Sequence, residues 1–153
     1  MRKIVLLALL VAGLAAGCRT IGRWTHSDGG FSEVAPTVAA EMMLDSQQVV
    51  VLDIRSSDRY RGPEGHIAGA LNAPFDSFTS ADVQLKPAED IAAVFVKAGV
   101  KPGDTVIGYC HIGQQATAML FAARSLGYRV LLYDGSFEDW STRDLPVDNP
   151  SKR

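Results

Sequence analysis

The chain is poor in cysteine: its 153 residues include only Cys18 and Cys110. Two cysteines are too few for the disulfide framework of a small secreted scaffold, so the fold must depend on a hydrophobic core. No Cys-x-x-Cys or His-x-x-x-His pair is present, and the histidines are scattered at His26, His66 and His111. This spacing argues against a zinc site, and we expect no metal.

The chain also has no excess of positive charge. Its formal net charge is −2 and its pI about 5.9. A basic surface is what holds nucleic acid or attracts acidic lipid headgroups, so we expect neither kind of partner. With 47% hydrophobic and 21% charged residues, the composition is typical of one folded domain.

The N-terminus has the layout of an export signal. Arg2 and Lys3 precede an apolar run at residues 4–14, and small residues follow. The run is shorter than the roughly 20 residues that a membrane-spanning helix needs. We therefore expect residues 1–17 to be a signal peptide that is removed.

A small-residue triplet, Ala15, Ala16 and Gly17, stands directly before Cys18. This arrangement resembles the bacterial lipoprotein signal, in which the cysteine is acylated and becomes the new N-terminus, although that signal favours leucine at the position of Ala15. The resemblance implies an exported lipoprotein that faces the periplasm or the cell exterior and is attached to the membrane only through lipidated Cys18. The alternative is ordinary secretion of a soluble periplasmic protein.

Hydrophobic patterning beyond an expected tether at residues 18–35 predicts several strands. Continuous apolar runs, unlike alternating ones, are typical of strands that are covered on both faces, as in a parallel sheet. The run at residues 49–52 is of this kind, and further strands are expected at residues 70–73, 105–109 and 129–133.

Helical spacing and helix-ending glycines predict helices between these strands. The expected helices are at residues 37–44, 88–98, 114–126 and 136–142. The alternating order predicts an α/β domain at residues 36–148, with an open, mainly parallel sheet and helices on both faces. Residues 149–153 are expected to be a C-terminal tail.

Ligands of open parallel sheets bind at the carboxyl ends of the strands. Three segments are expected there, at residues 53–60, 110–116 and 134–136. In the second, a strand passes into a helix through Gly113, and such a loop forms an anion-binding nest of backbone N–H groups. This location favours the nucleophilic thiolate of Cys110, whereas the alternative is that Cys110 is a small buried hydrophobe.

Four ordered motifs resemble the rhodanese family across residues 37–146. They are Asp-Ile-Arg at 53–55, Gly-His-Ile-Ala-Gly-Ala at 65–70, Cys-His-Ile-Gly at 110–113 and Gly-Ser-Phe-Glu-Asp-Trp at 135–140. Each motif alone is weak, but their order and spacing together are similar to those of a single-domain rhodanese. The resemblance implies a rhodanese-like open sheet and sulfurtransferase activity.

In the reaction that this resemblance implies, the Cys110 thiolate takes the outer sulfur of thiosulfate or a related persulfide donor. A thiophilic acceptor, cyanide or a thiol, then removes the sulfur from the Cys110 persulfide, and no cofactor is needed. The loop N–H groups would stabilise the anionic donor and the persulfide. The expected substrate-binding residues of the loop are His111, Ile112, Gly113, Gln114, Gln115 and Ala116.

Arg59 matches a position from which some family members direct a guanidinium at the donor. The alternative is a surface arginine paired with Asp58 or Glu64. Three residues near the site are expected to be structural: Asp53, Arg55 and His66.

Two positions in the loop bear on the choice of reaction. Gln115 stands where many family loops carry arginine, so we expect weaker thiosulfate affinity, and a neutral or bulkier persulfide is an alternative donor. A related cysteine phosphatase needs arginine where this chain has Ala116, which argues against phosphoryl transfer. The alternative function is a catalytically idle rhodanese-like binding module at the cell envelope.

Overall fold

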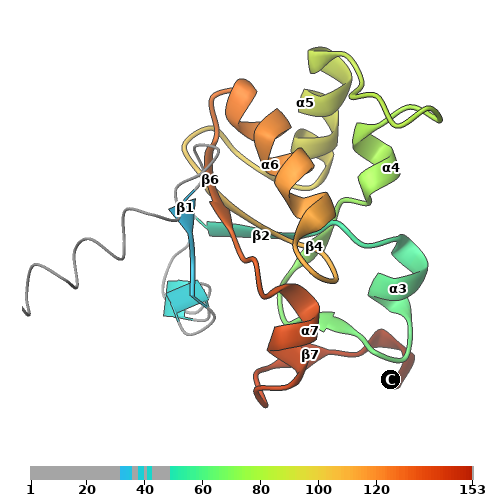
Figure 1. The fold of residues 1–153 in the computed structure, drawn as a ribbon, viewed down its shortest axis with the longest axis vertical. Helices are drawn as coiled ribbons and strands as arrows, with labels where there is room; N and C mark the ends of the chain where they lie inside the picture. Colours follow the sequence, from blue (N-terminus) through green and yellow to red (C-terminus); the bar gives the residue numbers. More distant parts are fainter. Residues whose placement is uncertain (1–31, 36–37, 40, 43–48, 153) are drawn as a thin grey trace, which may run out of the picture. The chain divides into compact units, whose positions relative to one another are not determined.

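A computed structural model of the chain describes residues 32–35, 38–39, 41–42 and 49–152 (Figure 1). The expected signal peptide, Cys18 and most of the expected tether lie outside these residues. Within them, every helix is too short or too polar to span a bilayer.

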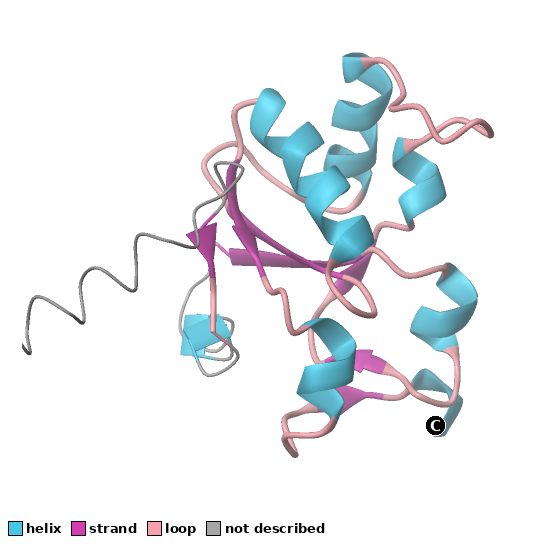
Figure 2. Ribbon diagram, in the orientation of Figure 1, coloured by secondary structure: helices cyan, strands magenta, loops and turns pink. Residues whose placement is uncertain are grey.

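The described part of the chain has a five-stranded parallel sheet at its centre (Figures 1 and 2). β2 and β5, the two longest strands, lie side by side within it, with Asp53 opposite Tyr109. The strands in spatial order are β1 (Ser32–Glu33), β6 (Arg129–Leu132), β5 (Thr105–Tyr109), β2 (Val49–Asp53) and β4 (Leu71–Asn72).

Both faces of the sheet are covered. Successive residues of β2 point to opposite faces, so Leu52 belongs to one apolar core and Val51 to the other. The continuous apolar run of this strand is what burial on both sides requires. The first core is covered by α4 (Phe75–Phe78), α5 (Ala88–Lys97) and α6 (Gln114–Ser125), and the second by α7 (Ser136–Ser141) and the helical residues 38–39 and 41–42.

The predicted fold class is therefore confirmed: the sheet is open and parallel, with helices on both faces. The predicted strands at 49–52, 105–109 and 129–133 correspond to β2, β5 and β6, and the strand at 70–73 to the shorter β4. The predicted helices at 88–98, 114–126 and 136–142 correspond to α5, α6 and α7. Of the helix predicted at 37–44, residues 38–39 and 41–42 are helical, and the others lie outside the described residues.

Several short elements were not predicted. α3 (Ser57–Arg61) follows β2, and β3 (His66–Ile67) pairs antiparallel with β7 (Val147–Asp148). Two-residue strands are too short to leave a periodic pattern in a sequence, and this pairing joins segments far apart in the chain. The β3–β7 pairing holds the C-terminal segment against the chain just before β4.

The folded part of the chain extends beyond both expected boundaries. Ser32–Glu33, in the expected tether, pair with β6 as β1. At the other end, the Asn149 side chain donates a hydrogen bond to the Pro63 carbonyl, and Pro150–Lys152 form the 3-10 helix η1. Both end segments have the composition of a linker. Backbone pairing with β6 holds the N-terminal one, and the side-chain amide of Asn149 holds the C-terminal one.

Candidate active site

The carboxyl ends of β2 and β5 carry the residues expected to form the site. The parallel register of the two strands brings residue 53 beside residue 109, and the Ile54 N–H donates to the Tyr109 carbonyl at 2.9 Å. Cys110 follows β5 directly, and α6 begins at Gln114. Two of the three segments expected after strands therefore leave the sheet side by side.

Gly113 makes the tight turn between β5 and α6. Its φ of 89° lies in the left-handed region, where only glycine is unstrained. A Cβ atom on Gly113 would lie 2.6 Å from Asp134 Oδ1, so the loop passes directly against the end of β6. Both the backbone conformation and this close approach require glycine here.

The loop has the unpartnered donors that an anion site needs. Among the described residues, the N–H groups of His111, Ile112 and Gly113 donate no hydrogen bond to protein atoms, and no side chain caps the start of α6. The first turn of a helix also leaves its own N–H groups without intrahelical partners. The positive end of the helix dipole therefore faces the loop.

Cys110, at the start of this loop, is a buried residue. The residue is only 2% exposed and belongs to the core beside Ala116, and its thiol is free. Four residues of the loop and of the first turn of α6 are exposed, with Ile112 at 50%, whereas Gly113 and Ala116 are buried. The sequence left a buried Cys110 as one of two alternatives, and the structure has it buried. The exposed residues are His111, Ile112, Gln114 and Gln115.

The backbone of Cys110 is held from the end of β6. Its N–H donates to Ser136 Oγ at 3.2 Å, and its carbonyl accepts the Phe137 N–H at 3.1 Å. The Ser136 hydroxyl in turn donates to the Tyr133 carbonyl at 3.0 Å. The sequence predicts a site segment at residues 134–136 but does not single out Ser136, whose one signal is its position after a strand and a glycine.

Asp53 and Arg55 form a buried ion pair beside the loop. Arg55 Nη2 lies 2.7 Å from Asp53 Oδ2 and also donates to the Gly65 carbonyl at 2.8 Å. The guanidinium stacks on the Phe137 ring at 3.8 Å. Burial alone would lower the pKa of Arg55, but the hydrogen bond and charge of Asp53 outweigh it and raise that pKa above its ordinary value.

Tyr109 links this ion pair to β5. Its hydroxyl donates to Asp53 Oδ2 at 2.8 Å and accepts the Ile67 N–H at 3.1 Å. Burial and the neighbouring Asp53 carboxylate raise the pKa of the Tyr109 hydroxyl well above its ordinary value, since both disfavour the phenolate. In the sequence, Tyr109 is only the last residue of an expected strand, and no pattern indicates this role.

The Rhodanese-like domain family model matches residues 35–143, which includes the Cys110 loop, both strands beside it and the Ser136 turn. The chain belongs to the rhodanese-like domain family.

Curated relatives of this rhodanese-like domain are named sulfurtransferases. The 3-mercaptopyruvate sulfurtransferase of Escherichia coli K12 is 29% identical over 134 residues, which are 79% of this chain and 47% of that protein. The thiosulfate sulfurtransferase of rat is 33% identical over 120 residues, 71% of this chain and 40% of that protein. The chain thus spans less than half the length of these relatives.

Solved structures support the same architecture. The anaerobic ergothioneine biosynthesis enzyme from Chlorobium limicola aligns with a TM-score of 0.66 at 24% identity, over 72% of this chain and 30% of that one. At this identity the likeness shows the fold alone.

Arg59 and His66, the two remaining expected residues, lie on the α3 side of the rhodanese-like domain. Arg59 is exposed on α3 and forms no ion pair with another described residue, whereas Glu64, one of its expected partners, lies 3.7 Å from Arg55 Nη1. His66 is buried, with Nδ1 2.9 Å from the Tyr60 carbonyl and its ring stacked on the Tyr60 ring at 3.6 Å. His66 thus ties β3 to the end of α3.

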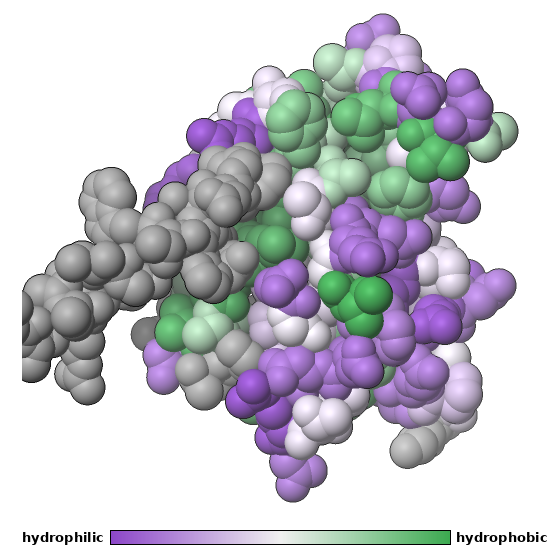
Figure 3. All heavy atoms as spheres, in the orientation of Figure 1, coloured by the Kyte–Doolittle hydropathy of each residue, from purple (hydrophilic) through white to green (hydrophobic). Residues whose placement is uncertain are grey.

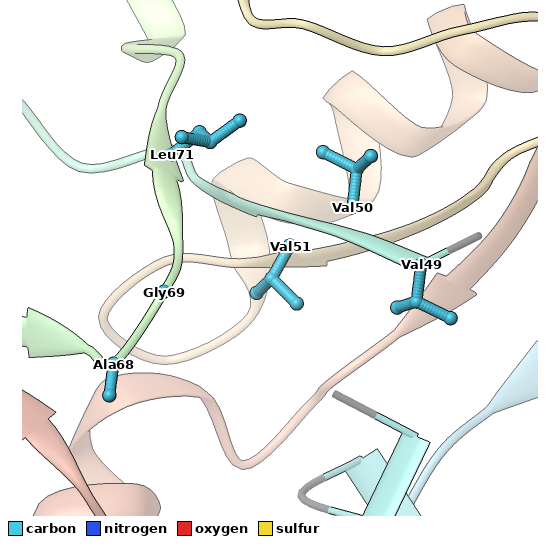
Figure 4. Close-up of a pocket in the computed structure, with 6 residues that line it drawn as sticks. All are labelled: Val49, Val50, Val51, Ala68, Gly69 and Leu71. Carbon is cyan, nitrogen blue, oxygen red and sulfur yellow. The ribbon is translucent and has the colours of Figure 1, made fainter. Parts of the chain in front are cut away.

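Surface depressions among the described residues include one at the sheet edge and one beside the Cys110 loop. One of about 170 Å³ lies along the open edge of β2, where β4 pairs only with the last two residues of the strand (Figure 4). Its lining carries no charged or nucleophilic side chain: Val49, Val50, Val51, Ala68, Gly69 and Leu71. The other, of about 390 Å³, adjoins the Cys110 loop at His111. The described residues contain no cluster of three or more His, Cys, Asp or Glu suited to a metal ion.

Proposed function

We propose that the chain is a sulfurtransferase in which Cys110 carries the transferred sulfur as a persulfide. The observation that carries this proposal is the position of Cys110, at the end of β5 and beneath a loop with three unpartnered N–H groups at the start of an uncapped helix. The names of the curated relatives support the same class of activity.

In the proposed first half-reaction, the Cys110 thiolate attacks the outer sulfur of thiosulfate or a related persulfide donor. The S–S bond of the donor breaks, and its electron pair departs with sulfite or with the donor thiolate. The N–H groups of residues 111–113 stabilise the negative charge on the bound donor and on the new persulfide. In the second half-reaction, cyanide or a thiol attacks the outer sulfur and restores the Cys110 thiolate.

The exposed side chains at the start of α6 offer a donor hydrogen bonds rather than charge. Gln114 and Gln115 are exposed and offer hydrogen bonds without charge. Arg59 is the cation that we assign to the donor, and it is exposed on α3. The Arg59→Gln variant is expected to raise the KM for thiosulfate more than it lowers kcat, because its guanidinium would act mainly in binding the donor.

One observation favours the second candidate, an idle binding module. A cysteine that is only 2% exposed has the burial of a structural residue. The two functions differ in the chemistry of this thiol. A sulfurtransferase requires the loop to admit a small electrophile, whereas in an idle module Cys110 would not react with iodoacetamide until the protein unfolds.

Steady-state kinetics tests the proposal. A double-displacement sulfurtransferase gives parallel double-reciprocal plots when thiosulfate is varied at several fixed concentrations of cyanide, and we expect this pattern. Cys110→Ser should abolish thiocyanate formation, while Cys18→Ser should not change it. A Cys110→Ser variant that retains full activity would overturn the assignment.

We also propose that the protein acts at the cell envelope, attached through acylated Cys18. The small residues before Cys18 and the apolar run at 4–14 support this proposal. Labelling of cells with palmitate should mark the wild-type chain and not Cys18→Ser. Equal labelling of the wild type and Cys18→Ser would contradict the proposal, and so would the absence of label from both.

A further inference from the structure

Three consecutive residues of α7 hold the start of the Cys110 loop. Ser136 Oγ accepts the Cys110 N–H at 3.2 Å, and the Phe137 N–H donates to the Cys110 carbonyl at 3.1 Å. The Glu138 N–H donates to the His111 carbonyl at 3.2 Å. The first N–H groups of a helix have no partners within that helix. Two of them are satisfied here by the loop, so the start of α7 and the loop hold each other.

These bonds also set the direction of the free N–H groups of the loop. In a planar trans peptide, the C=O and N–H bonds point in opposite directions. The carbonyls of Cys110 and His111 point to α7, so the N–H groups of the next residues, His111 and Ile112, point away from it. Neither of these N–H groups donates to a protein atom among the described residues. The Cys110 N–H, in contrast, is taken up by Ser136.

Contacts outside the loop hold α7 in place. The helix follows β6 after a short turn (Figure 1), and on the face shown in Figure 3 the surface over α7 is mainly hydrophilic. Its apolar residues Phe137 and Trp140 are buried. The Phe137 ring stacks on the guanidinium of Arg55 at 3.8 Å, and Trp140 Nε1 donates to the Pro146 carbonyl at 2.9 Å. The first turn of α7 is therefore a fixed support against which the loop is aligned.

We infer that Phe137 and Glu138 are positioning residues, whose backbone N–H groups orient the N–H groups of His111 and Ile112 toward the anionic sulfur donor. The inference rests on the proposed function. It assigns contact with the negative charge of the substrate to these two loop N–H groups and none to the Cys110 N–H. Hydrogen-bond donors that are fixed before the substrate arrives need no reorganisation when charge develops, which is how such groups accelerate a reaction.

Backbone esters test the role of α7 without changing a side chain. An amide-to-ester change at Glu138 replaces its N–H group with an oxygen and so removes the bond to the His111 carbonyl. The matched control is the same change at Asp139, whose N–H donates to the Gly135 carbonyl at 3.1 Å, within the first turn of α7. Both full-length chains lose one backbone hydrogen bond from the same helix, but only the first loses a bond to the loop.

The ester at Glu138 should lower kcat/KM for thiosulfate about tenfold or more, because the loop N–H groups lose their orientation. The ester at Asp139 should be destabilised to urea by a similar amount but keep the kcat/KM of the wild type. Equal values of kcat/KM in the two esters, with both chains folded, would overturn the inference.

Anion titration tests the orientation in the wild type, so it does not depend on how the esters fold. Sulfate is the probe, because it is an oxyanion without a transferable sulfur. In proton–nitrogen correlation spectra of the labelled full chain, we expect sulfate to shift the amide signals of His111 and Ile112 more than that of Cys110. A larger shift at Cys110 than at these two residues would overturn the inference, and so would the absence of any shift in the loop.

The two experiments separate this inference from the proposed function. A wild type that loads sulfur, together with equal kcat/KM in the two esters, would overturn the inference and leave the sulfurtransferase standing. Sulfate shifts at His111 and Ile112 in a chain that loads no sulfur would contradict the sulfurtransferase and keep the assigned orientation of the loop.

Discussion

The Ser136 hydroxyl lies between two strand ends: it accepts the Cys110 N–H at 3.2 Å and donates to the Tyr133 carbonyl at 3.0 Å. Ser136 is fully buried and has a φ of 53°, in the left-handed region that residues other than glycine rarely adopt. The proposed nucleophile is therefore positioned by a residue whose side chain compensates for an unfavourable backbone conformation.

Ser136→Ala and Ser136→Gly separate the effect of the Ser136 hydroxyl from the effect of its left-handed backbone conformation. Both lose the hydroxyl, but only alanine keeps the strain, so Ser136→Ala should lower the free energy of unfolding by about 1–3 kcal/mol and Ser136→Gly by less. Both should slow sulfur loading of Cys110, as measured by intact mass over time. Wild-type loading by Ser136→Gly would show that the hydroxyl does not position Cys110.

Gly113 and Gly127 form a matched pair for testing the loop. Their φ values are 89° and 87°, but a Cβ on Gly113 would meet Asp134, whereas one on Gly127 would meet nothing within 4 Å. Each change to alanine should cost about 1–2 kcal/mol of backbone strain, and Gly113→Ala should cost more because its Cβ meets Asp134. Only Gly113→Ala should also reduce sulfur loading, because it displaces the loop N–H groups. Equal loading by the two variants would contradict this role of the turn.

The sequence predicts the elements that leave strong local patterns. β2 and β5 are mainly apolar, and α6 ends before Gly127, so their positions follow from hydrophobic patterning and helix-ending signals. The β3–β7 pairing could not be predicted, since it depends on a long-range contact between two-residue segments. The left-handed conformation of Ser136 and the burial of Cys110 likewise arise from tertiary packing.

Arg55→Met should be strongly destabilising. The change leaves the Asp53 carboxylate buried without its cation, which typically costs about 3–5 kcal/mol. Arg143→Met is the control, because Arg143 pairs with Asp139 at the same 2.7 Å but with a side chain that is 49% exposed. Loss of that pair should cost about 1 kcal/mol or less. Urea unfolding measures the free energy of unfolding of both variants. Similar losses of stability in the two would contradict the importance of burial.

The raised pKa of the Tyr109 hydroxyl predicts that the protein loses stability at high pH. Its pKa is raised well above the ordinary 10.0 by burial and by Asp53, so the hydroxyl ionises in the unfolded chain before it does in the folded one. The unfolded state then binds fewer protons, and the free energy of unfolding falls as pH rises above about 10. Tyr109→Phe should make this slope shallower by up to about 1.4 kcal/mol per pH unit. Urea unfolding of the wild type and Tyr109→Phe at a series of alkaline pH values tests this prediction. Identical slopes of the free energy of unfolding against pH in the two proteins would argue against it.

The most direct test of Cys110 as the sulfur carrier is the intact mass of the reduced chain after incubation with thiosulfate, followed by cyanide. The account predicts that the wild type gains the mass of one sulfur atom, that cyanide removes it as thiocyanate, and that Cys110→Ser gains nothing. A folded wild type with reduced Cys110 that gains no sulfur from thiosulfate or from a small-molecule persulfide would contradict the account.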